Sequence, residues 1–129
     1  MWISAGKRLR HPGRGCGGQQ QGIGAIHLKQ PQLLQLKKGD LKTGKRYIAA
    51  CHDLASALHA QSIGCDAILL SPVLATATHP EASPLGWEQF ELIARQLQIP
   101  VFALGGMRQE LLIEAQQHHA YGIAGMRFL

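Results

Sequence analysis

The chain has 129 residues, of which 46% are hydrophobic, so it suits one domain with a buried core. It is shorter than the roughly 200–250 residues of a complete eight-stranded β/α barrel. Its formal net charge is +5, but no zinc-finger spacing, RNP-like motif or helix-turn-helix pattern accompanies this charge, so nucleic-acid binding is not predicted. No apolar run approaches the ~20 residues of a membrane span, so no membrane partner is predicted either.

The positive charge is concentrated at the N-terminus and between Lys37 and Arg46. We interpret the second cluster as a solubilising surface, with attraction of phosphorylated substrates as the alternative. The three cysteines, Cys16, Cys51 and Cys65, are too widely spaced for a disulfide framework or a metal knuckle. A reducing cytoplasm fits this pattern, and Cys65 is predicted to be an inert buried thiol.

Residues 1–21 are rich in Gly, Arg and Gln and show little periodicity. We predict a disordered or non-homologous leader there, followed by one domain over residues 22–129. In that domain, short apolar runs predict strands at 24–28, 46–51, 67–70, 101–104 and 122–126. Helical patterns between them predict helices at 31–36, 54–63, 84–98 and 109–119.

This alternation predicts an α/β fold with a parallel sheet of about five strands. Because five strands cannot close an eight-stranded ring, we expect an open edge and self-association through it. The helix that starts after Asp53, a good N-cap, should end at Gly64. Its inward stripe is predicted to consist of four residues: Leu54, Ala57, Leu58 and Ser62.

The next helix should pack through Trp87, Phe90, Ile93, Ala94 and Leu97. Leu111, Leu112 and Ala115 should point inward from the last helix. His118 and His119 are interpreted as a solvated helix end, because their spacing with His27 is not that of metal ligands.

Candidate ligand-binding residues follow two of the predicted strands. The strand at 67–70 ends in Ser71-Pro72 and leads into a loop that carries Thr76, Thr78 and His79. The strand at 101–104 runs directly into Gly105-Gly106, where the backbone can approach an anion without a Cβ in the way. Carboxyl ends of parallel strands are where α/β barrels present such groups.

The chain resembles the C-terminal part of the thiamine phosphate synthase/TenI family over residues 22–129. The segments that carry the resemblance are SPVLATATHPEASPLGWEQF, IPVFALGGM and AYGIAGMRFL. It is most similar to the version fused behind a MutT-type Nudix hydrolase, so a Nudix domain is an expected partner. The resemblance implies a partial TIM barrel and a transferase that joins hydroxymethylpyrimidine diphosphate to thiazole phosphate, releasing pyrophosphate.

The resemblance also implies roles for particular residues. Thr76 and Thr78 match substrate-contacting threonines, Gly105 and Gly106 match a phosphate-binding strand end, and His79 stands where synthases usually have lysine. Arg127 follows the last strand, where a phosphate-binding serine is common. The alternatives are loop hydroxyls that cap their own turn, a solvated His79, turn glycines that need only a positive φ, and a surface Arg127.

The chain departs from the family pattern at several positions. The family uses Mg²⁺, but Lys29 to Gln32 carry no carboxylate where synthases place an aspartate ligand, so we predict no metal site in this chain. Ala50 replaces a substrate-contacting serine, and Pro72 replaces the catalytic histidine of the tautomerase members. His52 is either a site residue at a strand end or packs beside Asp53.

These departures leave three functions open, and catalytic residues unassigned. The first is thiamine phosphate synthesis, or substrate binding alone. The second is a non-catalytic phosphate-binding accessory module of a Nudix hydrolase fusion. The third is an inactive fragment.

Overall fold

The structure is a computed structural model that describes residues 2–5, 25–74 and 83–125. Its strands are β1 (Trp2–Ser4), β2 (Ala25–Leu28), β3 (Arg46–Cys51), β4 (Ala67–Leu70), β5 (Val101–Leu104) and β6 (Gly122–Gly125). Its helices are α1 (Gln30–Leu34), α2 (Leu54–Ile63), α3 (Gly86–Ala94), the short 3-10 helix η1 (Gln109–Leu111) and α4 (Leu112–Gln117). The fold is therefore α/β, as predicted.

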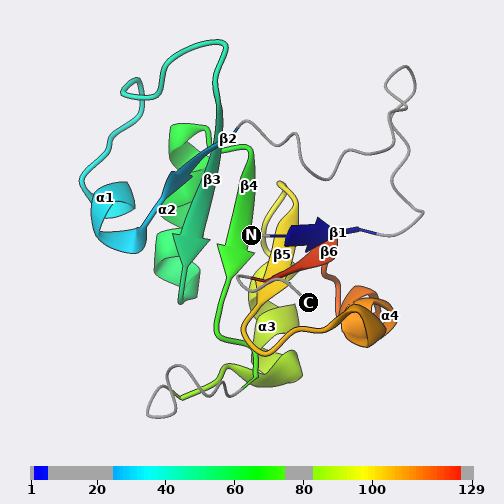
Figure 1. Ribbon diagram of the computed structural model, residues 1–129. Coiled ribbons are helices and arrows are strands. Elements are labelled where there is room, and N and C mark those ends of the chain that lie inside the picture. The colour runs from blue at the N-terminus through cyan, green and yellow to red at the C-terminus, as the bar shows by residue number, and fades with distance from the viewer. Residues whose placement is uncertain (1, 6–24, 75–82, 126–129) are drawn as a thin grey trace.

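The described strands form one six-stranded sheet in the order β1-β6-β5-β4-β3-β2 (Figure 1). From β2 to β6 every neighbouring pair is parallel and follows chain order. Because such crossovers are right-handed, an unbroken sequential order places all the helices on one face of the sheet. This is the winding of a β/α barrel, and the sheet curls like half of one.

The strand β1 is an addition that the sequence did not predict. It pairs antiparallel with β6, with Trp2 opposite Gly125 and Ser4 opposite Ile123. A Cβ added to Gly122 would collide with the Ser4 carbonyl oxygen and lie 2.9 Å from the Ala5 Cα. Glycine at residue 122 therefore lets β1 approach β6 closely. Trp2–Ser4, which belong to the predicted disordered or non-homologous leader, are thus ordered in a strand. Residues 6–24 lie outside the described part, so for them the leader stays a prediction.

The strands alternate their side chains between two apolar layers. One layer lies between the sheet and the helices and includes Tyr47, Ile68, Leu70, Phe90 and Ile123. The other lies on the opposite face of the sheet. It consists of Ile48, Ala67, Leu69, Phe102 and Ala124, with Ile3, Ala5, Ala25 and Leu104 packed against them. Both faces of β4 are buried, which explains its continuous apolar sequence.

The helix α2 starts and ends as predicted, but its buried face differs. Asp53 Oδ1 accepts a hydrogen bond from the Ser56 backbone N–H at 2.8 Å, and Gly64 ends the helix with φ +104. The predicted stripe is wrong at Leu58, which is 41% exposed, and at Ser62, which is also exposed. The buried positions are Ser56, Ala57, Ala60 and Ile63. Small side chains on this face let the helix backbone lie close to the sheet.

The predicted core face of α3 is confirmed for Phe90, Ile93, Ala94 and Leu97, while Trp87 is half-buried. The helix is shorter than predicted, since it begins at Gly86 and ends at Ala94. Ala115 is buried in α4, as expected. A short 3-10 turn, η1, replaces the first turn of the predicted last helix.

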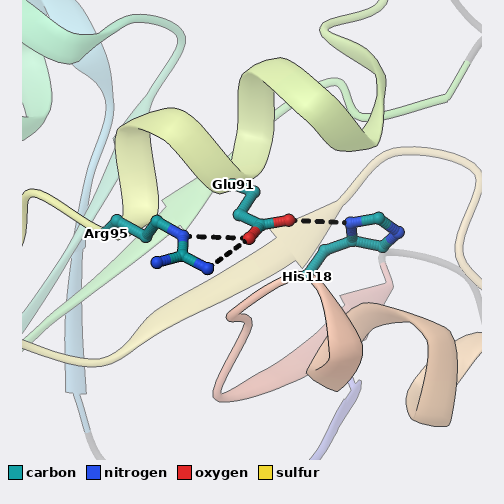
Figure 2. Close-up of polar contacts among 3 residues, drawn as sticks. All are labelled: Glu91, Arg95 and His118. Carbon is teal, nitrogen blue, oxygen red and sulfur yellow. Dashed lines mark hydrogen bonds and ion pairs between the residues drawn. The ribbon is translucent and has the colours of Figure 1, made fainter.

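A polar cluster joins α3 to the end of α4 (Figure 2). Glu91 lies between two partners: Arg95 Nη2 is 2.7 Å from its Oε2, and His118 Nδ1 is 3.1 Å from its Oε1. The hydrogen bonds from Arg95 and then from His118 lower the pKa of the Glu91 carboxyl. The His118 ring also stacks on Trp87, with ring centroids 5.3 Å apart. The prediction of a helix end is confirmed, since His118 is the C-cap of α4, and His119 is exposed as expected. The prediction that His118 is solvated is wrong, because its side chain is half-buried against Glu91 and Trp87.

Candidate functional site

The candidate site lies at the carboxyl edge of the sheet, where β2 to β5 end and their loops begin. Parallel strands of consecutive β/α units all end at the same edge, so these loops are neighbours in space although they are far apart in sequence. The arrowheads of β3 and β4 point to this edge at the lower side of Figure 1. The first residues of these loops are Lys29, His52, Ser71 and Gly105.

The ends of β4 and β5 are joined by two backbone hydrogen bonds beyond the sheet itself. The Val73 N–H donates to the Leu104 carbonyl at 3.0 Å, and the Leu74 N–H donates to the Gly105 carbonyl at 3.2 Å. The segment that leads into the threonine loop is therefore fixed directly against the glycine pair. The ends of β4 and β5 therefore lie side by side up to Leu74.

The same segment also closes the base of the threonine loop. The Leu85 N–H donates to the Pro72 carbonyl at 2.7 Å, and the Gly86 N–H donates to the Val73 carbonyl at 2.9 Å. Both ends of the loop are thus held together beside β5. Thr76, Thr78 and His79 themselves lie outside the described residues, and so does Arg127.

Gly105 must be glycine for two reasons. Its φ is +108, in the region that residues with a side chain rarely adopt. An added Cβ would lie 2.8 Å from the Pro72 Cα and 2.9 Å from the Val73 nitrogen. Gly106 follows with φ +71. The backbone therefore turns sharply at the end of β5, and Gly105 allows the β4 loop to lie directly against this turn.

Successive backbone N–H groups in a turn can bind one anion, and Gly105 and Gly106 form a turn at the end of β5. Such groups bind phosphate through dipoles and hydrogen bonds without a formal charge. The carboxyl edge can therefore bind a phosphoryl group through backbone amides, next to a loop whose sequence contains hydroxyl side chains.

His52 also lies at this edge, and the sequence allowed two roles for it: a site residue, or a side chain packed beside Asp53. Its ring Nδ1 is 2.9 Å from the Ser71 carbonyl oxygen, and its backbone N–H donates to Gln30 Oε1 at 2.9 Å. The side chain is thus engaged with the β4 end, while the residue's backbone contacts the start of α1. The sequence feature that indicated a role at this edge was the position of His52 directly after the buried strand β3.

The described residues of the carboxyl edge do not fit a magnesium site. Asp53, the carboxylate next to the end of β3, caps α2 with its Oδ1 through the Ser56 N–H. That hydrogen bond, followed by one with the Ser56 side chain, lowers the pKa of Asp53. Over the described ranges, no three His, Cys, Asp or Glu side chains gather as metal ligands. We therefore assign no reaction step to a metal ion.

The two described cysteines are not candidates for a nucleophile. Cys51 is completely buried, Cys65 is 3% exposed, and both are free thiols. Burial raises the pKa of each thiol to about 11. A thiol with so high a pKa is protonated at neutral pH and reacts slowly. This confirms the predicted burial of Cys65.

The basic segment from Lys37 to Arg46 lies far from the candidate site. It precedes β3 and therefore lies at the amino edge of the sheet, at the top of Figure 1. Its contacts are local: the Lys37 N–H donates to Asp40 Oδ2 at 2.7 Å, and the Lys42 N–H donates to the Tyr47 hydroxyl at 3.0 Å. This placement favours the solubilising interpretation over a role at the carboxyl edge.

Among the helices that the structure describes, none has the length and apolar character needed to cross a membrane.

Comparisons with known proteins agree on one family. The family described as "Thiamine monophosphate synthase" matches residues 19–129. The "Thiamine-phosphate synthase" of Chloroflexus aurantiacus is 34% identical over 100 residues, which cover 77% of this chain and 46% of that protein. The "Putative thiamine-phosphate synthase 2" of Aquifex aeolicus is 42% identical over 77 residues, covering 60% of this chain and 41% of that protein.

A solved structure shows the same fold. Thiamine phosphate pyrophosphorylase from Pyrococcus furiosus superposes with a TM-score of 0.61 at 21% identity, covering 80% of this chain and 48% of that protein. The chain thus spans about half the length of these three proteins.

Proposed function

We propose that this chain, which belongs to the thiamine monophosphate synthase family, binds a phosphorylated thiazole or pyrimidine at the carboxyl ends of β4 and β5. The residues assigned to this ligand are Thr76, Thr78, His79, Gly105, Gly106 and Arg127. The process served is thiamine biosynthesis. The whole family reaction, which joins the pyrimidine diphosphate to the thiazole phosphate and releases pyrophosphate, is part of the proposal.

One observation carries the proposal: the backbone hydrogen bonds from Val73 to Leu104 and from Leu74 to Gly105. They hold the base of the threonine loop against the glycine pair, so that hydroxyl and amide donors can meet one ligand. In the proposed site, the Gly105 and Gly106 amides hold the phosphate. The threonine hydroxyls and Arg127 supply donors around it. Arg127 can bind a phosphate bidentately, which makes it the strongest single cation of the set.

The proposed reaction demands mainly electrostatic stabilisation. Charge builds up on the departing pyrophosphate as the carbon–oxygen bond breaks, and preorganised donors at the carboxyl edge lower the energy of that state. In the family, Mg²⁺ supplies part of this charge stabilisation when it is bound. Here His79 takes the place of a lysine, and histidine is mostly uncharged at neutral pH. We therefore expect weaker stabilisation of pyrophosphate than in synthases with lysine.

Isothermal titration calorimetry with thiamine monophosphate and with the thiazole phosphate tests the proposal. Thr76→Val and Thr78→Val remove a hydroxyl at constant shape and should each weaken binding about tenfold, as loss of one or two hydrogen bonds would. Thr43→Val is the matched control, since Thr43 lies in the exposed amino-edge segment. Absence of saturable binding by the wild-type chain would contradict the proposal.

A second candidate is a non-catalytic phosphate-binding module, the role expected of a fusion partner of a Nudix hydrolase. The state of Asp53 favours it, because this carboxylate beside the end of β3 already caps α2 through the Ser56 N–H. A coupled assay for pyrophosphate release separates the two candidates. Turnover with both substrates would exclude the accessory role, while ligand binding without turnover would support it.

We further propose that the chain self-associates through β2 and works in the cytoplasm. Among the described strands, β2 pairs on one side only, with β3, and its Ile26 side chain is 39% exposed. An edge strand with unpaired backbone groups and an exposed apolar side chain favours pairing with another chain. The two buried free thiols fit a reducing compartment.

A further inference from the structure

His52 connects three neighbouring loops at the carboxyl edge. Its backbone N–H donates to Oε1 of Gln30, the first residue of α1, and its ring Nδ1 contacts the Ser71 carbonyl at 2.9 Å. Because a carbonyl oxygen only accepts hydrogen bonds, Nδ1 carries the proton in this contact. Nδ1 is protonated in both this neutral tautomer and the imidazolium, so the contact needs no charge on the ring.

The Ser71 carbonyl belongs to the residue from which the threonine loop departs. Ser71 is 8% exposed, and its N–H donates to the Cys51 carbonyl at 3.1 Å. The backbone N–H and carbonyl of Ser71 are therefore both hydrogen-bonded to residues at the end of β3, Cys51 and His52. Two residues later, Val73 is held from β5 by its hydrogen bond to Leu104. The segment from Ser71 to Leu74 is thus fixed from both neighbouring strands.

We propose that His52 is a positioning residue for the candidate ligand site. It fixes the Ser71 carbonyl, and through it the register of the segment from Ser71 to Leu74 against Gly105. This inference rests on the proposed function, since it concerns the same ligand. His52 acts through Ser71, so the inference requires no contact between the imidazole and the ligand.

The chain contains a matched control for this hydrogen bond. His59 Nε2 is 2.8 Å from the Leu36 carbonyl oxygen and joins α2 to the segment after α1. It is also a ring-to-carbonyl contact between neighbouring elements, but its hydrogen-bond partner, Leu36, follows α1 and does not belong to the ends of β4 or β5. His59→Ala should therefore lower the stability of the fold about as much as the loss of the His52 hydrogen bond does, without affecting the ligand site.

Amide hydrogen exchange of the ligand-free full chain tests the positioning role. In His52→Ala, exchange at Val73 and Leu74 should accelerate about threefold to tenfold, the range set by one ordinary hydrogen bond. His52→Asn, which keeps an N–H donor near the place of Nδ1, should restore slow exchange. His59→Ala should leave these two amides unchanged. Equal acceleration in His52→Ala and His59→Ala would contradict the inference.

Calorimetry with thiamine monophosphate completes the test. The dissociation constant should rise about threefold to tenfold in His52→Ala, return towards the wild-type value in His52→Asn and stay unchanged in His59→Ala. If His52 had a purely structural role, His52→Ala and His59→Ala would both lower the melting temperature, and neither would change the dissociation constant. Wild-type binding with an unchanged constant in His52→Ala would overturn the role of His52 alone. No binding by the wild type would overturn the proposed function.

Discussion

Gly105 shows how one residue can set the geometry of a site through its missing side chain. Its positive φ and its contact with Pro72 together bring the β4 loop against the end of β5. The sequence offered two interpretations of this glycine, phosphate binding and a turn that needs a positive φ. The conformational requirement is now established, and phosphate binding stays a proposal.

We predict that Gly105→Ala lowers the free energy of unfolding by roughly 2–4 kcal/mol, because backbone strain of about 1–3 kcal/mol adds to a collision with the Pro72 backbone. Gly39→Ala is the control, since Gly39 has φ +98 but nothing within 4 Å of an added Cβ. It should show only the strain, about 1–2 kcal/mol. Urea denaturation measures both, and equal losses would contradict the role of the Pro72 contact.

The contact between α3 and α4 depends on the cluster around Glu91. Its lowered pKa means that the carboxylate stabilises the folded chain above its ordinary value of 4.5. This stabilisation is lost as the pH falls through the lower value of the folded state, because protonation removes the charge that Arg95 and His118 contact.

Glu91→Gln should therefore lower the melting temperature near neutral pH, and the difference from the wild type should shrink as the pH falls below 4.5 and through the lowered pKa of Glu91. Glu88→Gln, on the same helix, is the control and should differ little from the wild type at either pH. Thermal melting followed by circular dichroism gives both comparisons. A difference that persists unchanged in acid would show that the carboxylate charge is not what joins α3 to α4.

The helices also show where sequence reasoning succeeds and where it fails. Asp53 and Gly64 could be predicted as ends of α2 because capping is local chemistry between residues close in the chain. The inward face of α2 was predicted only in part. Ala57 is buried as expected, but Ala60 is buried where the helix approaches the sheet closely, while the larger Leu58 stays exposed. The contact of His118 with Glu91 joins residues 27 positions apart and has no local signal.

At the scale of the whole molecule, the alternation of apolar runs and helical patterns predicted a parallel sheet, which β2 to β6 form. The antiparallel β1 could not be predicted, since its position depends on β6, which lies at the other end of the chain. The proximity of the β4 and β5 ends could be predicted from the fold class, because neighbouring parallel strands end at the same edge of the sheet. The contact of His52 with Ser71 could not, because a ring and a carbonyl 19 residues apart give no sequence pattern.

Self-association through β2 is also a property of the whole molecule. Ile26→Lys places a charge on the edge strand and should shift the chain towards the monomer in sedimentation velocity experiments. Leu58→Lys is the control, since Leu58 is 41% exposed against 39% for Ile26 but lies on α2. A monomeric wild type, or equal effects of the two substitutions, would contradict association through this edge.

The central claim is that the carboxyl ends of β4 and β5 hold one phosphoryl-bearing ligand between them. An NMR titration of the ¹⁵N-labelled chain with thiamine monophosphate tests it most directly. The claim predicts saturable shifts of the Gly105 and Gly106 amides together with Val73 and Leu74. Shifts confined to the basic segment from Lys37 to Arg46, at the opposite edge of the sheet, would contradict it.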